Sequence, residues 1–137
     1  MQKINKVIAL LLAVYGYAKD IHYNCKGDSF YSKHLLCDRI SENIYDYIDS
    51  IKEVCFLASE DEPLLSKQYA EMSARVTPDL SSDDKQNFTR LLALVSQTLQ
   101  AIHDLDNLTK GEDNLFGNIA ENLQTSMGLL VRQVQNG

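Results

Sequence analysis

Apolar residues recur at spacings of three and four along most of the chain, a pattern typical of amphipathic helices. It predicts four long helices, over Ile4–Asn24, Phe30–Leu57, Ser82 (as N-cap) to Ile102, and Leu115 to Val134 after a break at Lys110–Gly111. A shorter helix is expected near Ser66–Arg75, within the connection 64–82. Two helical hairpins joined by a long crossover are the ferritin-like arrangement of an all-α four-helix bundle.

Length and composition agree with this fold. The chain has 137 residues, which fits a single bundle domain over 1–137. Its six glycines and two prolines are too few for an all-β fold, which needs frequent turns. The apolar run Val7–Val14 is too short for a membrane span. We therefore expect a cytoplasmic protein without a membrane segment.

The cysteines are Cys25, Cys37 and Cys55, an odd number without a Cys-x-x-Cys pair. This pattern predicts reduced thiols rather than a disulfide framework or a zinc ribbon. The helical periodicity places Cys37 in the core. Cys25 falls in an expected loop after the first helix, where an exposed thiol beside redox chemistry could oxidise.

The charge restricts the partners. Nineteen acidic and 13 basic side chains give a formal charge of −6. A generic nucleic-acid binder needs a basic face, so we expect no appreciable DNA binding at physiological salt. An acidic surplus favours either solubility or the binding of cations.

Part of that surplus forms a stripe on the helix expected over 30–57. On a helical wheel, four carboxylates lie within about 100° of His34, and the apolar residues lie on the other side. The carboxylates are Asp38, Glu42, Asp49 and Glu53. Such a stripe alone is typical of a solvated face. The histidine within it, and His22 at the end of the preceding helix, favour a metal site.

One metal ion could not reach the whole stripe of one chain. Asp38 and Asp49 are eleven residues apart in the sequence, about 16 Å along a straight helix. His34 with Asp38 can form one half-site, and Asp49 with Glu53 another. A two-fold axis near Asn43–Ile44 would join each half-site to its complement in a second copy. The sequence thus predicts a dimer with two interfacial sites, with ligands that suit iron, manganese or zinc.

These residues carry a resemblance to a known family. The segment 22–34, His-Tyr-Asn-Cys-Lys-Gly-Asp-Ser-Phe-Tyr-Ser-Lys-His, resembles the His-Trp-Asn-x-x-Gly-x-x-Phe-x-x-x-His signature of Dps proteins. These are miniferritins, also described as DNA-binding proteins from starved cells. Asp38, Asp49 and Glu53 follow at the family's ligand spacings. The resemblance continues more weakly through residues 69–72 and 114–116.

The resemblance implies a hollow dodecamer with ferroxidase sites between two-fold-related subunits. It implies that Fe(II) is bound by His22, His34 and Asp38 of one subunit and by Asp49 and Glu53 of its neighbour. Glu53 would be the central ligand. The family oxidises this iron, typically with hydrogen peroxide, and stores ferric oxide, which protects the cell against oxidative damage.

Two further positions bear on the resemblance. Tyr23 stands near the expected iron site, where the family usually has Trp. Glu112 and Asp113 stand where the family lines the pores through which iron enters, although the helix dipole alone favours acids at a helix N-terminus. Two alternatives stay open: a structural assembly protein with little chemistry, and a zinc- or manganese-binding dimer without iron storage.

Overall fold

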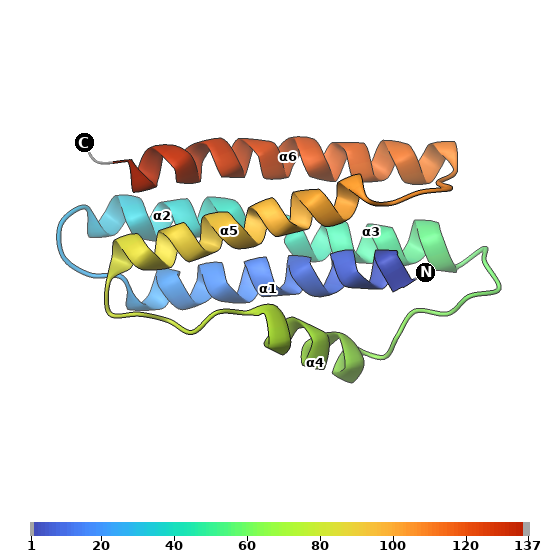
Figure 1. The fold of residues 1–137 in the computed structure, drawn as a ribbon, viewed down its shortest axis with the longest axis horizontal. Coiled ribbons are helices and arrows are strands. Elements are labelled where there is room, and N and C mark those ends of the chain that lie inside the picture. The colour runs from blue at the N-terminus through green and yellow to red at the C-terminus, as the bar shows by residue number, and fades with distance from the viewer. Residues whose placement is uncertain (1, 136–137) are drawn as a thin grey trace.

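A computed structural model describes residues 2–135. Over this range the chain forms six α-helices and no strand (Figure 1). The helices are α1 (Gln2–Asn24), α2 (Phe30–Ser41), α3 (Ile44–Phe56), α4 (Ser66–Val76), α5 (Asp84–His103) and α6 (Lys110–Val134).

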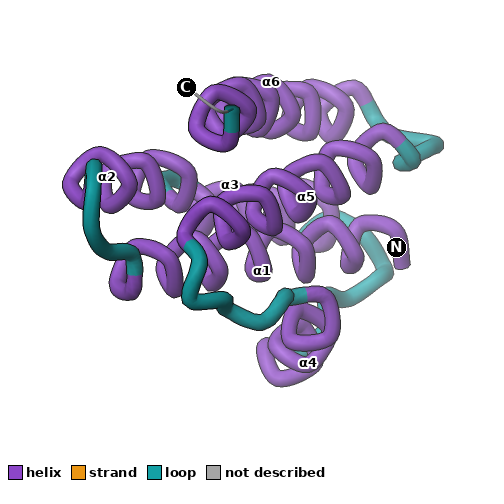
Figure 2. The backbone as a smooth tube through the Cα atoms, turned by 60° about the vertical axis from the view of Figure 1, so that its left-hand side comes forward, coloured by secondary structure: helices purple, strands orange, loops and turns teal. Residues whose placement is uncertain are grey.

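The long helices form an antiparallel bundle. Helices α1 and α6 run in one direction, and α2, α3 and α5 run in the other, with α2 and α3 in succession along one side (Figure 1). The crossover 57–83 returns the chain along the length of the bundle and carries α4 on the outside (Figure 2). The expected all-α bundle with a short crossover helix is confirmed.

The core lies on the inner faces of the long helices. Its largest fully buried side chains include Tyr17, Phe88 and Phe116. Helix α1 is buried along most of its length because α2, α3, α4 and α5 all pack against it. This central position explains the apolar run Val7–Val14. Between residues 2 and 135, no helix is long and apolar enough to cross a membrane.

One tyrosine holds the crossover helix to the bundle. Tyr69 is the buried residue of α4. Its hydroxyl donates to Asn5 Oδ1 at 2.6 Å and accepts from the backbone N–H of Leu64 at 3.1 Å. A buried polar network of this kind fixes one docking position, because any shift would leave its members without partners.

The helix expected over Phe30–Leu57 is not continuous. It is interrupted at Glu42 and Asn43, and Asn43 adopts a left-handed backbone with φ 69°. Asn tolerates this conformation better than most residues because its short polar side chain bonds locally. Ile40 and Ile44 are both buried and keep a four-residue spacing across the break, so the apolar pattern conceals it.

Two other boundaries differ from expectation. Helix α5 begins at Asp84, with Asp83 rather than Ser82 as the N-cap. Helix α6 begins at Lys110, so the break expected at Lys110–Gly111 is wrong. Thr109 and Glu112 form a capping box there, in which each side chain accepts a hydrogen bond from the other's backbone N–H. These bonds start the helix despite the following glycine.

The cysteines are free. Cys25 lies in the loop after α1 as expected, but its expected exposure is wrong. Cys25 is only 4% exposed, and Cys37 and Cys55 are buried too. Burial raises the pKa of Cys37 to about 12 and that of Cys55 to about 11. Burial also raises the pKa of Cys25. All three groups are therefore protonated at neutral pH, and the thiol is the unreactive form.

We expect the native protein to react with Ellman's reagent at neutral pH about a hundredfold more slowly than free cysteine, or slower still. In denaturant, all the thiols should react at the rate of free cysteine. Absorbance of the released thiolate measures both rates. A native thiol that reacts as fast as free cysteine would contradict the burial described for these side chains.

Candidate metal centre

The hairpin between α1 and α2 brings two predicted ligands together. His22 lies in the last turn of α1 and His34 near the start of α2. Their imidazole rings stack with centroids 3.5 Å apart and planes at 18°. His22 is buried and His34 is half-buried. The structure thus pairs residues that are twelve positions apart in the sequence.

The two histidines exchange hydrogen bonds with each other's backbone. His22 Nδ1 lies 2.7 Å from the carbonyl oxygen of His34, and His34 Nδ1 lies 2.9 Å from the carbonyl oxygen of His22. A carbonyl oxygen can only accept, so each Nδ1 carries a proton and donates. The lone pair of each neutral ring is then on Nε2, which is the form that binds a metal ion.

The turn between the histidines depends on two left-handed residues. Gly27 has φ 75° and Ser29 has φ 61°. The N–H of Phe30 bonds to the carbonyl oxygen of Gly27 at 3.1 Å and closes the turn. Ser29 occupies the N-cap position, but its side chain makes no capping hydrogen bond. The backbone of the turn, rather than a cap, sets where α2 begins.

Aromatic rings extend the histidine stack on both sides. The ring of Tyr23 meets His22 edge-on, with centroids 4.9 Å apart. The ring of Phe30 stacks on His34 at 5.4 Å. Tyr23 is 75% exposed, so it lies beside the histidines without covering them. Tyr23 therefore stands next to the candidate site, where an oxidisable ring could give up an electron to an oxidant.

Asp38 bonds to a lysine that the sequence did not suggest. Lys19 Nζ donates to Asp38 Oδ1 at 3.1 Å, and the two side chains are 25% and 58% exposed. The hydrogen bond from Lys19 lowers the pKa of Asp38, and the same bond raises the pKa of Lys19. Both groups are therefore charged at neutral pH. Lys19 precedes His22 by three residues, so a shared helix face was the signal that could have identified it.

Asp49 and Glu53 lie on a separate helix. Both side chains are exposed on α3, one helical turn apart, beyond the break at Asn43. In the part of the chain that the structure describes, no three His, Cys, Asp or Glu side chains lie close enough to hold a metal ion. The structure therefore brings His22 and His34 together, but neither Asp38 nor Asp49 nor Glu53 of the same chain completes a group of three with them.

The two acidic residues assigned to a pore lie in the first turn of α6. Glu112 is half-buried and its carboxylate accepts from the N–H of Thr109, so it has a structural role in the capping box. Asp113 is exposed. The helix dipole favours both acids at this position, which accounts for them without a pore.

The surface around the histidines and α3 carries many exposed apolar side chains. Most of the large ones on the described chain lie between residues 23 and 57. They are Tyr23, Phe30, Tyr31, Leu35, Tyr45, Val54 and Leu57. Such a concentration of exposed apolar groups is typical of a protein interface.

Comparison with known proteins shows the fold. No protein-family model matches the chain, and no curated protein sequence matches it. Several solved structures match, and three of them have TM-scores of 0.85, 0.83 and 0.84 over 99% of this chain. They are DpsC from Streptomyces coelicolor (22% identity, 83% of its chain covered), Dps from Thermosynechococcus elongatus (17%, 92%) and Mycobacterium smegmatis Dps (15%, 86%). The chain has the ferritin-like fold of Dps miniferritins.

We expect Lys19→Met to tighten Co²⁺ binding by about two- to fivefold, because the ammonium group no longer competes for Asp38. Isothermal titration of the assembled protein measures the affinity. Lys3→Met is the matched control, because Lys3 pairs with Asp106 far from the histidines and its loss changes the net charge equally. Equal affinities in the two variants would contradict competition at Asp38.

Proposed function

We propose that the protein binds Fe(II) between two-fold-related copies, oxidises it with hydrogen peroxide and retains the ferric product inside a hollow oligomer. The observation that carries the proposal is the exchange of hydrogen bonds between His22 and His34. Each bond occupies Nδ1, and each leaves Nε2 for a metal ion.

The donor set suits iron in both oxidation states. Imidazole nitrogen binds ferrous iron well, and hard carboxylate oxygens stabilise the ferric product. His22, His34 and Asp38 of one copy would hold the iron together with Asp49 and Glu53 of its neighbour, with Glu53 as the central ligand. Each Fe(II) gives up one electron and peroxide accepts two, so two ferrous ions and two protons convert one peroxide to two waters. This stoichiometry removes both reagents of the Fenton reaction.

The need for a second copy follows from where the ligands lie. Asp49 and Glu53 are exposed on α3 and form no metal site with the histidines of their own chain. The exposed aromatic and aliphatic side chains between residues 23 and 57 would be covered by a copy of the same face. Carboxylates gathered there without a cation would repel one another, so bound iron would stabilise the contact.

The similarity in fold to three Dps structures supports assembly beyond the dimer. We propose a cage of twelve copies, in which the dimer sites supply iron to an internal cavity. With a charge of −6 on each copy, we expect the cage not to bind DNA appreciably.

Anaerobic mixing of the protein with Fe(II) and then with peroxide should produce ferric absorbance. We expect His34→Ala and Glu53→Gln to lower the initial rate at least about tenfold, because each removes an iron ligand. Glu42→Gln is the matched control: it removes an exposed carboxylate of the same stripe, at the end of α2, that belongs to no half-site.

Equal rates in all four proteins would contradict oxidation at this site. Size-exclusion chromatography separates the remaining alternatives. A cage of twelve with normal rates supports storage, and a dimer that binds Zn²⁺ or Mn²⁺ but oxidises no iron would replace the proposal.

A further inference from the structure

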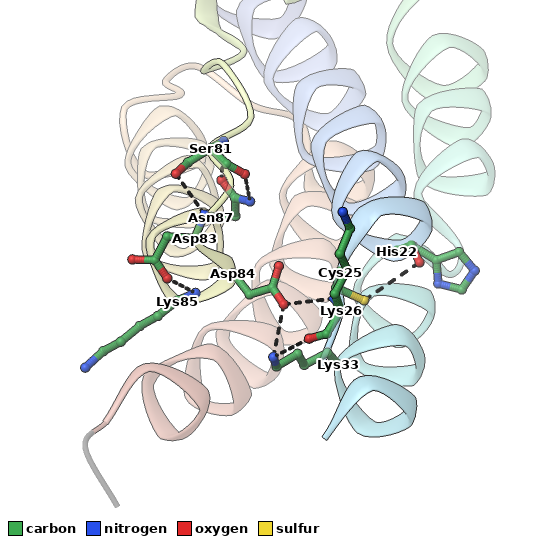
Figure 3. Close-up of polar contacts among 9 residues, drawn as sticks. All are labelled: His22, Cys25, Lys26, Lys33, Ser81, Asp83, Asp84, Lys85 and Asn87. Atoms are coloured by element: carbon green, nitrogen blue, oxygen red, sulfur yellow. Dashed lines mark hydrogen bonds and ion pairs between the residues drawn. The ribbon is translucent and has the colours of Figure 1, made fainter. Parts of the chain in front are cut away.

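A three-way hydrogen-bonded cluster joins the histidine hairpin to the start of α5 (Figure 3). Asp84 Oδ2 accepts from the backbone N–H of Lys26 and from Lys33 Nζ, both at 3.0 Å. Lys33 Nζ also donates to the carbonyl oxygen of Lys26 at 3.1 Å. The Asp84 carboxylate therefore connects three segments: the α1–α2 loop, α2 and α5.

This cluster is better shielded from water than the other ion pairs in the described chain. The side chains of Lys33 and Asp84 are 17% and 18% exposed, whereas Lys3 and Asp106 are 57% and 66% exposed. Shielded ion pairs with additional hydrogen bonds keep a fixed geometry, whereas exposed ion pairs contribute little to stability. Burial opposes ionisation of Asp84, but the bonds from Lys26 and Lys33 outweigh it and lower the pKa of Asp84.

The cluster lies beside the histidines in the sequence but faces the other way. Lys26 follows His22 by four residues, and Lys33 directly precedes His34. In Figure 3 the Asp84 carboxylate points at the loop and Lys33, whereas the imidazole of His22 projects away from α5 on the far side of the hairpin. The Asp84 carboxylate therefore points away from the imidazole of His22, so we do not assign it as a ligand.

The two hydrogen bonds from the imidazoles to backbone carbonyl oxygens demand accurate placement of the two helices. Both Nδ1 donors must meet carbonyl oxygens of the opposite helix at 2.7 and 2.9 Å at the same time. A small slide of α2 along α1 would break both bonds. The loop between the helices contains two left-handed residues, Gly27 and Ser29, and its N-cap side chain makes no capping bond.

We propose that Asp84 is a positioning residue for His22 and His34: by holding Lys26 and Lys33 it fixes the register of α1 and α2 and so aims both imidazoles at the metal. This inference rests on the proposed iron site. On this inference, the N-terminus of α5 controls the geometry of that site although it contributes no ligand.

The neighbouring Asp83 provides a matched control. Asp83 accepts from the N–H of Lys85 at 3.1 Å as the N-cap of α5, and within residues 2–135 its side chain forms no bond to the hairpin. Asn caps helices as well as Asp does, so Asp83→Asn removes the same charge one residue away and keeps the cap. Asp84→Asn keeps the size of the side chain and loses the charge that holds Lys33.

The test is Co²⁺ binding to the assembled protein. Titration calorimetry measures the affinity, and the visible ligand-field spectrum reports the geometry of the bound ion. We expect Asp84→Asn and Lys33→Met each to weaken Co²⁺ binding about tenfold and to alter the spectrum, as loss of a group that orients a ligand does. The double variant should be no weaker than the single ones, because both remove the same contact. Asp83→Asn should bind as the unaltered protein does.

Unchanged Co²⁺ affinity and spectrum in Asp84→Asn, with only a lower urea midpoint, would overturn the positioning role and leave the iron site standing. If the unaltered protein binds no Co²⁺, the proposed function fails instead. Crystal structures of the metal-free variants then decide the inference. It stands if the histidine stack is lost in Asp84→Asn and kept in Asp83→Asn, and it is overturned if both variants keep the stack.

Discussion

Two hydrogen bonds between the end of α1 and the start of α2 hold the two imidazoles on which the proposed chemistry depends. The Nδ1 atoms of His22 and His34 each donate to the other residue's carbonyl oxygen, so both rings are held in one tautomer and one orientation. A free histidine on a surface helix has neither restriction. If these rings bind a metal ion as proposed, their order exists beforehand, and less of the binding free energy would be lost in arranging the ligands.

The same structure leaves the site incomplete within one chain. Lys19 occupies an oxygen of Asp38, and the carboxylates of Asp49 and Glu53 lie exposed on another helix. A second copy would supply the missing carboxylates, and a divalent cation would offset their mutual repulsion. On this view the acidity of the chain and the exposed apolar groups between residues 23 and 57 have one explanation, a face that pairs with itself around metal.

The sequence predicted the bundle well because burial dictates it: apolar spacing indicated the long helices, and a short helix was expected in the connection between them. The break at Asn43 was missed because Ile40 and Ile44 keep the helical spacing across it. Local sequence also suggested the histidine pair. It could not suggest that Asp84 bonds to Lys33, because 51 residues separate them and only the packing of α5 against the hairpin unites them.

The central claim is that each site takes ligands from two chains. Mixing subunits tests it directly: His34→Ala and Glu53→Gln chains are unfolded together, reassembled in equal amounts and assayed for iron oxidation by peroxide. If a two-fold axis joins the half-sites, random pairing rebuilds about a quarter of the sites from the two defective chains, and about a quarter of the unaltered rate should return. A mixed oligomer no more active than either variant alone would contradict the claim.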